Sequence, residues 1–279
     1  MRQIEVAQVT QAVKAAAIAA NYEPGADLLA ALARGAEAEE SPIGKEIFRQ
    51  LLENARIAKE ERIPMCQDCG LAVVFAEIGQ DVHLVGGDLD QAINAGIRQG
   101  YAEGFLRKSL CHPLTRANTG DNTPAVIHTE IVPGDRLKLT VVPKGGGSEN
   151  MSRLFMLKPA DGLAGIKARV VITVEEAGPN PCPPLIVGVG IGGNFERAAL
   201  LAKKSLLREL GQANPDPEVA AIERQLLAEV NDLGIGPQGL GGRITAMAVH
   251  VLMQPCHIAS LPVAVNIQCH ASRHQEVVL

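Results

Sequence analysis

The densest chemistry in the chain stands immediately before an apolar run, in residues 63–78: IPMCQDCGLAVVFAEI. The first half places two thiols, an amide and a carboxylate in a short loop, and Pro64 and Gly70 mark its ends as non-helical. Soft thiolates beside oxygen ligands suit zinc, iron–sulfur or disulfide chemistry. The second half, residues 71–78, predicts a strand. A buried pair of cysteines without chemical consequence is the alternative, so a functional interpretation needs support from the rest of the chain.

Helical and extended patterns both flank this stretch. Ser41 and Pro42 predict the start of one helix, because serine caps a helix and proline suits its first position. Pro133-Gly134-Asp135 separates two apolar, β-branched segments and predicts the turn of a β-hairpin. Residues 107–124 contain several chain breakers and predict a polar loop. The other elements of this half are helices at 4–21, 27–36, 42–55 and 88–101, and strands at 71–78, 83–85, 125–131 and 136–142.

The second half of the chain mixes the same patterns. Residues 160–177 suit a strand by their β-branched content, but Ile166, Val170 and Val174 repeat at helical spacing, which favours a helix. The other elements are strands at 185–191, 245–253 and 261–267, and helices at 194–210 and 216–233. No internal repeat or linker separates these elements. The predicted fold class is therefore mixed α/β, a single domain of residues 1–279 with a mixed β-sheet and surrounding helices.

Composition narrows the function classes. The 279 residues are 47% hydrophobic and 20% charged, which is ordinary for a globular protein. A net charge of −5, the absence of Trp and an aromatic content of 3% argue against nucleic-acid binding. No apolar run reaches about 18 residues, so no membrane span is expected. Six cysteines, in a chain whose first residues lack a signal-peptide core, favour reduced thiols in the cytoplasm.

Two further cysteines stand in settings that suit a metal site. Cys182 lies in NPCPP, where prolines restrict the backbone, and Cys269 ends the last predicted strand. Both are too distant in sequence from Cys66 for a local zinc knuckle or a ferredoxin-type run, so the fold would have to assemble them. Three thiolates on a cubane cluster leave one iron open as a Lewis acid. Three other thiols remain open as ligands or as inert buried groups: Cys69, Cys111 and Cys256.

The glycine-rich stretches have competing interpretations. Gly188, Gly190 and Gly193 satisfy GxGxxG, but Glu209 falls in the predicted helix instead of after a second strand. Tight packing of a strand on a helix therefore explains these glycines better than dinucleotide binding does. Residues 144–148, KGGGS, suit either an anion-binding nest or a flexible turn.

Isolated charged residues are also ambiguous. Arg107 and Arg116 suit bidentate pairing with carboxylates, although a single arginine is commonly a surface residue. His257 stands between two predicted strands, where it suits an acid/base group or a structural role.

Eight motifs together extend along most of the chain: IPMCQDCG (63–70), LRKS (106–109), NTGDNTPAVIH (118–128), KGGGSENMS (144–152), AGPNPCPP (177–184), VGVGIGGNFE (187–196), LGIGPQGLGG (233–242) and HIASLPVAV (257–265). With these motifs the chain resembles the class I, iron–sulfur-dependent fumarate hydratases and the related L(+)-tartrate dehydratases. It is similar to the α subunit of the two-subunit form, which is equivalent to the N-terminal half of the single-chain form.

The resemblance implies a set of site residues. It makes Cys66, Cys182 and Cys269 the ligands of a 4Fe-4S cluster with one open iron. It implies that Asp68 and His257 act in catalysis, and that the substrate is bound by Gln67, Arg107 and Gly146. The chain differs from most of the family in having Cys69, where threonine is usual, and Cys256.

The resemblance also implies an activity and a partner. The reaction would be the reversible addition of water to fumarate, giving (S)-malate, with L(+)-tartrate as the alternative substrate. A β subunit would supply further substrate contacts and the base, so the chain is expected to act as a hetero-oligomer with that subunit. A zinc-binding or redox module built on Cys66 and Cys69 is the alternative from another class of protein.

Overall fold

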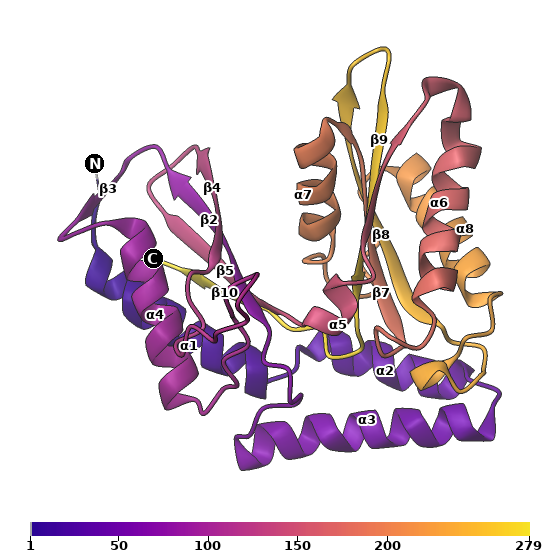
Figure 1. Ribbon diagram of the computed structural model, residues 1–279, viewed down its shortest axis with the longest axis horizontal. Helices are drawn as coiled ribbons and strands as arrows, with labels where there is room; N and C mark the ends of the chain where they lie inside the picture. Colours follow the sequence, from indigo (N-terminus) through magenta and orange to yellow (C-terminus); the bar gives the residue numbers. More distant parts are fainter. Residues whose placement is uncertain (1) are drawn as a thin grey trace. The chain divides into compact units, whose positions relative to one another are not determined.

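The computed structural model describes residues 2–279, and the chain divides into two compact units (Figure 1). Unit 1 consists of the described residues up to Gly25, Ala55–Gly146 and Arg273–Leu279, and unit 2 consists of Ala26–Asn54 and Gly147–Ser272. Helices and mixed sheets occur in both units, which confirms the mixed α/β fold class. The extent of a single domain over residues 1–279 stays a prediction.

Unit 1 contains a four-stranded mixed sheet in the order β10-β5-β2-β4. The central strand β2 runs parallel to β4 and antiparallel to β5, and β10 is antiparallel to β5. Two helices, α1 and α4, pack on each other and on this sheet. The bounds are β2 (Leu71–Gly79), β4 (Val126–Val132), β5 (Leu137–Lys144), β10 (Gln275–Val278), α1 (Val6–Tyr22) and α4 (Leu89–Glu103).

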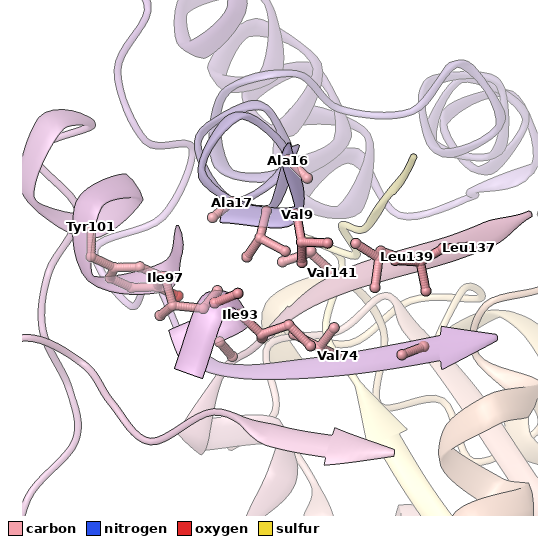
Figure 2. Packing of buried hydrophobic residues seen from close by; sticks show 14 of the residues in the cluster. Val9, Ala16, Ala17, Val74, Ile93, Ile97, Tyr101, Leu137, Leu139 and Val141 are labelled. Carbon is pink, nitrogen blue, oxygen red and sulfur yellow. The ribbon is translucent and has the colours of Figure 1, made fainter. Parts of the chain in front are cut away.

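The core of unit 1 is almost entirely aliphatic. Figure 2 shows Val9 and Ala17 of α1 in one cluster with Ile93 and Ile97 of α4, and Val141 of β5 close to Val9. Small residues allow the helices to approach closely, because a Cβ at Gly96 would lie 2.8 Å from the Val13 Cβ. Alternate side chains of β2 and β5 point into this core, as the two-residue period of a strand requires.

The predicted β-hairpin of residues 125–142 is wrong. Both strands form, but β2 lies between them and pairs with each. The turn at Gly134 instead crosses the end of β2, where the Gly134 carbonyl accepts from Asp81 N at 2.9 Å. β3 (Val82–Val85), which follows β2 along the chain, pairs in parallel with β1 (Arg2–Glu5). The sequence did not predict β1.

Unit 2 contains a second four-stranded mixed sheet in the order β6-β9-β7-β8, with helices on both faces (Figure 1). One face is covered by α6 and α8, and the other by α7. A separate apolar cluster joins α2 and the first part of α3 to the sheet. The bounds are β6 (Arg153–Leu157), β7 (Leu185–Gly193), β8 (Ala246–Cys256), β9 (Leu261–Gln268), α2 (Ala26–Ala38), α3 (Pro42–Glu61), α5 (Gly146–Glu149), α6 (Gly162–Ala177), α7 (Phe195–Ser205) and α8 (Pro217–Asn231).

The glycines of β7 serve helix packing. A Cβ at Gly188 would lie 2.3 Å from the Ala202 carbonyl, and one at Gly190 would lie 2.1 Å from the Ala198 carbonyl. Only glycine therefore permits α7 to approach this face of the strand. This geometry supports strand–helix packing as the reason for the GxGxxG pattern.

Other predictions from the sequence agree in type with the structure. The ambiguous segment is helical as α6, and Ser41 Oγ accepts from Gly44 N at 3.3 Å at the start of α3. Besides β1, the sequence did not predict β6 or β10. None of the helices in residues 2–279 has the length and apolar character needed to cross a bilayer.

Candidate functional site

The cysteine loop of residues 63–70 lies in unit 1, between α3 and β2. Its backbone is attached to the preceding helices, because Ile63 N donates to the Ala58 carbonyl at 3.1 Å and Met65 N donates to the Asn21 carbonyl at 3.0 Å. Cys66 is half-buried and Gln67 is exposed at the tip of the loop. The loop therefore presents a thiol and an amide on a fixed backbone.

Asp68 connects this loop to the KGGGS segment. One carboxylate oxygen, Oδ1, accepts from Gly70 N at 3.0 Å and lies 3.5 Å from Ser109 Oγ. The other, Oδ2, accepts from Gly146 N at 2.7 Å. The anion that a backbone N–H of the KGGGS segment binds in this structure is thus the Asp68 carboxylate itself.

Cys69 is part of the core and does not extend the reactive loop. Its side chain is 2% exposed, and its sulfur accepts from Arg107 N at 3.2 Å. Burial raises the pKa of the Cys69 thiol, and the Arg107 N–H only partly opposes that effect. A redox CxxC pair requires an accessible thiolate with a lowered pKa. Cys69 therefore has the properties of a structural thiol.

Tyr101 and Asn122 donate hydrogen bonds to the backbone of the cysteine loop. Sequence reasoning identified neither residue. Tyr101 Oη donates to the Cys69 carbonyl at 2.6 Å, and burial raises the pKa of this phenol. Asn122 Nδ2 donates to the Gly70 carbonyl at 3.1 Å, while its Oδ1 accepts from Ser109 N at 2.7 Å. Asn122 thereby ties the LRKS segment to the cysteine loop, and its place within the NTGDNTP motif is the sequence signal that could have revealed it.

Arg273 is a further residue that the sequence did not indicate. Its side chain is 5% exposed, and Nη2 donates to the Asp68 carbonyl. Its Nε and Nη1 are buried without a hydrogen-bond partner among residues 2–279. A buried cation thus lies directly behind the Asp68 backbone. Arg107, in contrast, is exposed at the start of the polar loop.

Unit 2 brings together the two remaining cysteines predicted as ligands. Cys182 precedes β7 and Cys269 follows β9, and the antiparallel register pairs Ile186 with Gln268. Both cysteines therefore lie at the same end of the sheet, where β7 begins and β9 ends. A backbone contact confirms this proximity, because His270 N donates to the Cys182 carbonyl at 3.4 Å. Cys182 is exposed and Cys269 is half-buried.

His257 does not lie at this end of the sheet. It is exposed in the turn between β8 and β9, where its Nδ1 accepts from Ala259 N at 3.1 Å. The eight residues of β9 separate His257 from Cys269, which at about 3.4 Å per residue is roughly 27 Å. Within one copy of unit 2, His257 and the two cysteines are thus at opposite ends of the strand.

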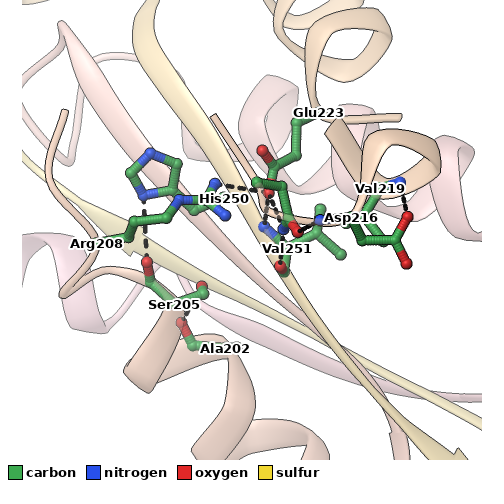
Figure 3. Close-up of polar contacts among 9 residues, drawn as sticks. Ala202, Ser205, Arg208, Asp216, Val219, Glu223, His250 and Val251 are labelled. Carbon is green, nitrogen blue, oxygen red and sulfur yellow. Dashed lines mark hydrogen bonds and ion pairs between the residues drawn. The ribbon is translucent and has the colours of Figure 1, made fainter. Parts of the chain in front are cut away.

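A second buried polar cluster in unit 2 is structural (Figure 3). Glu223 Oε1 accepts from Arg208 Nη2 at 2.6 Å and from Val251 N at 2.7 Å. His250 is 3% exposed, and its Nδ1 lies 3.2 Å from the Ser205 carbonyl. Burial, with the nearby Arg208 charge, lowers the pKa of His250 to about 4. This cluster joins α7 and α8 to β8.

The donor set suits a cluster with a soft metal. All six cysteines are outside disulfides, and three of them occupy loops next to strands. Thiolate ligands select iron–sulfur centres and zinc over harder ions. Among residues 2–279, no three His, Cys, Asp or Glu side chains are arranged as a metal-binding group. Cys182 and Cys269 lie at one end of the sheet of unit 2, and Cys66 belongs to unit 1.

Comparisons with known proteins extend over nearly the whole chain. The family model described as "Fumarate hydratase (Fumerase)" matches residues 10–278. A protein of Methanocaldococcus jannaschii named "Putative L(+)-tartrate dehydratase subunit alpha" is 43% identical over 261 residues, which cover 91% of each chain. The "L(+)-tartrate dehydratase subunit alpha" of Escherichia coli strain K12 is 34% identical over 241 residues, which cover 85% of this chain and 79% of that one.

Proposed function

Because the chain belongs to the fumarate hydratase family, we propose that it is the α subunit of an iron–sulfur-dependent hydro-lyase that hydrates fumarate reversibly to (S)-malate. The observation that supports this most strongly is the match of the family model to residues 10–278, which include every predicted site residue. The fold-level similarity alone would not define the reaction, but the site residues supply its chemistry.

L(+)-tartrate is the second candidate substrate. Two relatives at 43% and 34% identity carry the name of the tartrate dehydratase α subunit. Both reactions involve a four-carbon dicarboxylate and a hydroxyl group at the carbon that gains or loses water. One set of carboxylate-binding and hydroxyl-binding groups therefore suits either substrate.

Three cysteines would hold the cofactor: Cys66, Cys182 and Cys269. The fit is chemical, since all three are thiols in loops beside strands and two of them lie at one end of a sheet. A 4Fe-4S cluster held by three thiolates supplies a Lewis-acidic iron that polarises the substrate hydroxyl. The burial and raised pKa of Cys69 make it a poor substitute ligand, which weighs against a zinc or redox module built on Cys66 and Cys69.

The groups around Asp68 provide orientation and proton transfer. Backbone N–H groups of Gly70 and Gly146 bind the two oxygens of its carboxylate and so fix its plane. A carboxylate held in this way can accept a proton or orient the group that does. Gln67 is exposed next to Asp68 in sequence, and Arg107, whose backbone N–H donates to the Cys69 sulfur, is exposed as well. A guanidinium is suited to bidentate binding of a substrate carboxylate.

The His257 of the same chain is too distant to act beside Cys182 and Cys269. Because it lies at the other end of β9 from Cys269, a second copy of the chain would have to supply it. We retain His257 as a proposed substrate-positioning residue on that condition. Its exposed position in the turn between β8 and β9 is compatible with such a contact.

The proposed enzyme includes a β subunit and acts in the cytoplasm. The names of the relatives describe α subunits, which implies a second type of subunit in those proteins. Six cysteines outside disulfides suit a reducing compartment.

An anaerobic assay of the chain with its co-expressed partner tests this function. We expect a brown complex with about four irons per chain, and hydratase activity on fumarate measured beside L(+)-tartrate at equal concentrations. A higher kcat/KM for tartrate would select the second candidate. A colourless protein with one zinc per chain, inactive on both acids, would contradict the proposal.

A further inference from the structure

The glycine-rich segment of residues 233–242 lies against the loop that carries Cys182. The backbone N–H and the side-chain Nε2 of Gln238 both donate to the Pro183 carbonyl, each at 2.8 Å. Gly239 permits this approach, because a Cβ there would lie 2.3 Å from the Pro179 Cβ. The segment therefore binds the backbone carbonyl of Pro183, the residue after Cys182, by two hydrogen bonds.

The same amide of Gln238 also faces His270. Because the Pro183 carbonyl can only accept, the amide group must present its nitrogen there and not its oxygen. The second hydrogen on Nε2 is then available to His270 Nδ1, which lies 3.2 Å away. Gln238 thus contacts the residue after Cys182 and the residue after Cys269 with one side-chain atom.

His270 completes the connection in either neutral tautomer. Its Nδ1 lies 3.0 Å from the Cys182 carbonyl and its backbone N donates to the same oxygen at 3.4 Å. A ring protonated on Nδ1 donates to the Cys182 carbonyl, and a ring protonated on Nε2 accepts from Gln238 at Nδ1. In each form Nδ1 therefore makes one of these two hydrogen bonds, with the Cys182 carbonyl or with Gln238 Nε2, while the backbone N–H of His270 donates to the Cys182 carbonyl in both.

The backbone in this region needs such support. Cys182 has φ 56° and Gln238 has φ 54°, which is the left-handed region that residues with a side chain rarely adopt. Conformations of this kind persist where surrounding contacts determine them. The hydrogen bonds of Gln238 and His270 are contacts of that type, and they act on the segment that aims the Cys182 thiol.

We propose that Gln238 and His270 form a clamp that holds Cys182 and Cys269 as a pre-formed pair of cluster ligands. Both are positioning residues, since each acts through the backbone next to a cysteine. The inference rests on the proposed function, because it takes these two cysteines as ligands. Groups that orient metal ligands commonly change metal affinity by about 10- to 100-fold when they are removed, so the clamp would control how well the cluster is retained.

The test compares four variants of the full chain, purified anaerobically with its partner. Gln238→Leu and His270→Ala remove the clamp. His270→Asn restores a side-chain amide near the place of Nδ1, and Gln225→Leu on the exposed side of α8 is the matched control. Iron and acid-labile sulfide per chain are measured, together with the rate at which an iron chelator bleaches the cluster. Hydrogen exchange of the Asn180 and Cys182 amides, the two backbone N–H groups within residues 179–184, and of residues 268–271 is followed in the cluster-free chain.

Gln238→Leu and His270→Ala are expected to accelerate bleaching about tenfold or more, and to raise hydrogen exchange in both segments. The cluster of His270→Asn should bleach at close to the wild-type rate, and that of Gln225→Leu should bleach at the wild-type rate. Wild-type bleaching rates in both clamp variants would overturn the proposal. If Gln238→Leu does not fold, the two His270 variants decide the question, because they leave the glycine-rich segment intact.

The proposed function is judged separately. A wild-type complex that holds no iron would refute the hydro-lyase assignment, and with it the ligand role of the clamp. A wild-type complex that holds the cluster and hydrates fumarate, while both clamp variants retain iron as firmly, would refute only the clamp.

Discussion

Asp68 is the proposed catalytic residue of unit 1, and hydrogen bonds hold both its side chain and its backbone. Each of its carboxylate oxygens accepts from a different backbone N–H, and Arg273 binds its carbonyl from behind. An asparagine has the same shape but only one acceptor oxygen. It would therefore have to turn its NH2 group toward either Gly70 N or Gly146 N, which would lose one hydrogen bond and place two donors together.

We expect Asp68→Asn to lower kcat for fumarate by at least about 100-fold, because proton transfer by a positioned group typically contributes that much. The free energy of unfolding should fall by only about 1 kcal/mol. Steady-state kinetics and urea unfolding measure the two effects. Asp81→Asn, in an exposed turn of the same unit, is the matched control. Activity within threefold of wild type in Asp68→Asn would remove Asp68 from the mechanism.

His250 gives unit 2 a defined dependence on pH. Its pKa is about 4 in the folded chain and about 6.5 when unfolded, so the unfolded chain takes up the proton first as the pH falls. The stabilising contribution is therefore complete above about pH 6.5 and is lost as the pH falls toward 4. The shift corresponds to at most about 3 kcal/mol.

Replacement of His250 by Asn should remove that dependence, because an amide can still donate to the Ser205 carbonyl but does not titrate. Urea unfolding at pH 7 and pH 4.5 measures it. We expect the wild type to lose about 2 kcal/mol or more relative to the variant over that interval. Equal losses in both proteins would show that His250 is protonated without cost in the folded state.

At the residue scale, sequence reasoning could single out candidates only where their chemistry stands in a local motif. Cys66, Gln67 and Asp68 are adjacent in one motif, and the structure places them in one ordered loop. Arg273 and Asn122 contact that loop from distant parts of the chain, and each is an ordinary polar residue in its own neighbourhood. Their roles depend on tertiary contacts, which no local pattern encodes.

At the scale of elements, the β4–β5 segment shows how a correct local prediction gives a wrong pairing. The turn at Pro133-Gly134-Asp135 is present, but the strands on its two sides pair with β2 and not with each other. The nearly uninterrupted apolar run of β2 was the available signal, since such a run is typical of a central strand buried on both faces. Edge strands such as β6 and β10 are short and lack that pattern, so their partners decide whether they form.

Helix α8 provides a prediction at this scale. Asp216 caps it, because Oδ1 accepts from Glu218 N at 2.9 Å. The same oxygen accepts from Val219 N at 3.3 Å, a contact that Figure 3 shows. Asp216→Ala should lower the free energy of unfolding by about 1 kcal/mol. At the other end of the helix, Asp232→Ala should be neutral or stabilise by a few tenths of a kcal/mol, since a carboxylate there opposes the helix dipole. Thermal unfolding of both variants measures the difference, and equal effects would contradict the capping role.

At the scale of the whole molecule, the division into two units was beyond sequence reasoning. Each unit is assembled from separated segments, and α3 contributes residues to both. No change in composition marks these boundaries. One of them falls within α3, and another falls at the first residue of α5. The mixed α/β class, in contrast, follows from periodicity alone and was predicted correctly.

The proposed enzyme gives a prediction for the assembly. The chain purified alone should retain iron but turn over fumarate at least about 100-fold more slowly than the complex, if the partner supplies the proton-transferring group. Titration of the iron-loaded chain with separately purified partner should restore activity to a plateau at one partner per chain. Full turnover by the chain alone would show that it carries a complete site.

The tail of the chain has a consequence for biosynthesis. Strand β10 closes the edge of the unit 1 sheet, and Leu279 exchanges two backbone hydrogen bonds with Leu137. Unit 1 begins first on the ribosome, yet its sheet cannot be completed until residue 279 has emerged. Unit 2, which begins later, has all its residues once Ser272 has been translated. A nascent chain stalled or trimmed before residue 273 would therefore expose an unpaired β5 edge, which chaperones and proteases recognise.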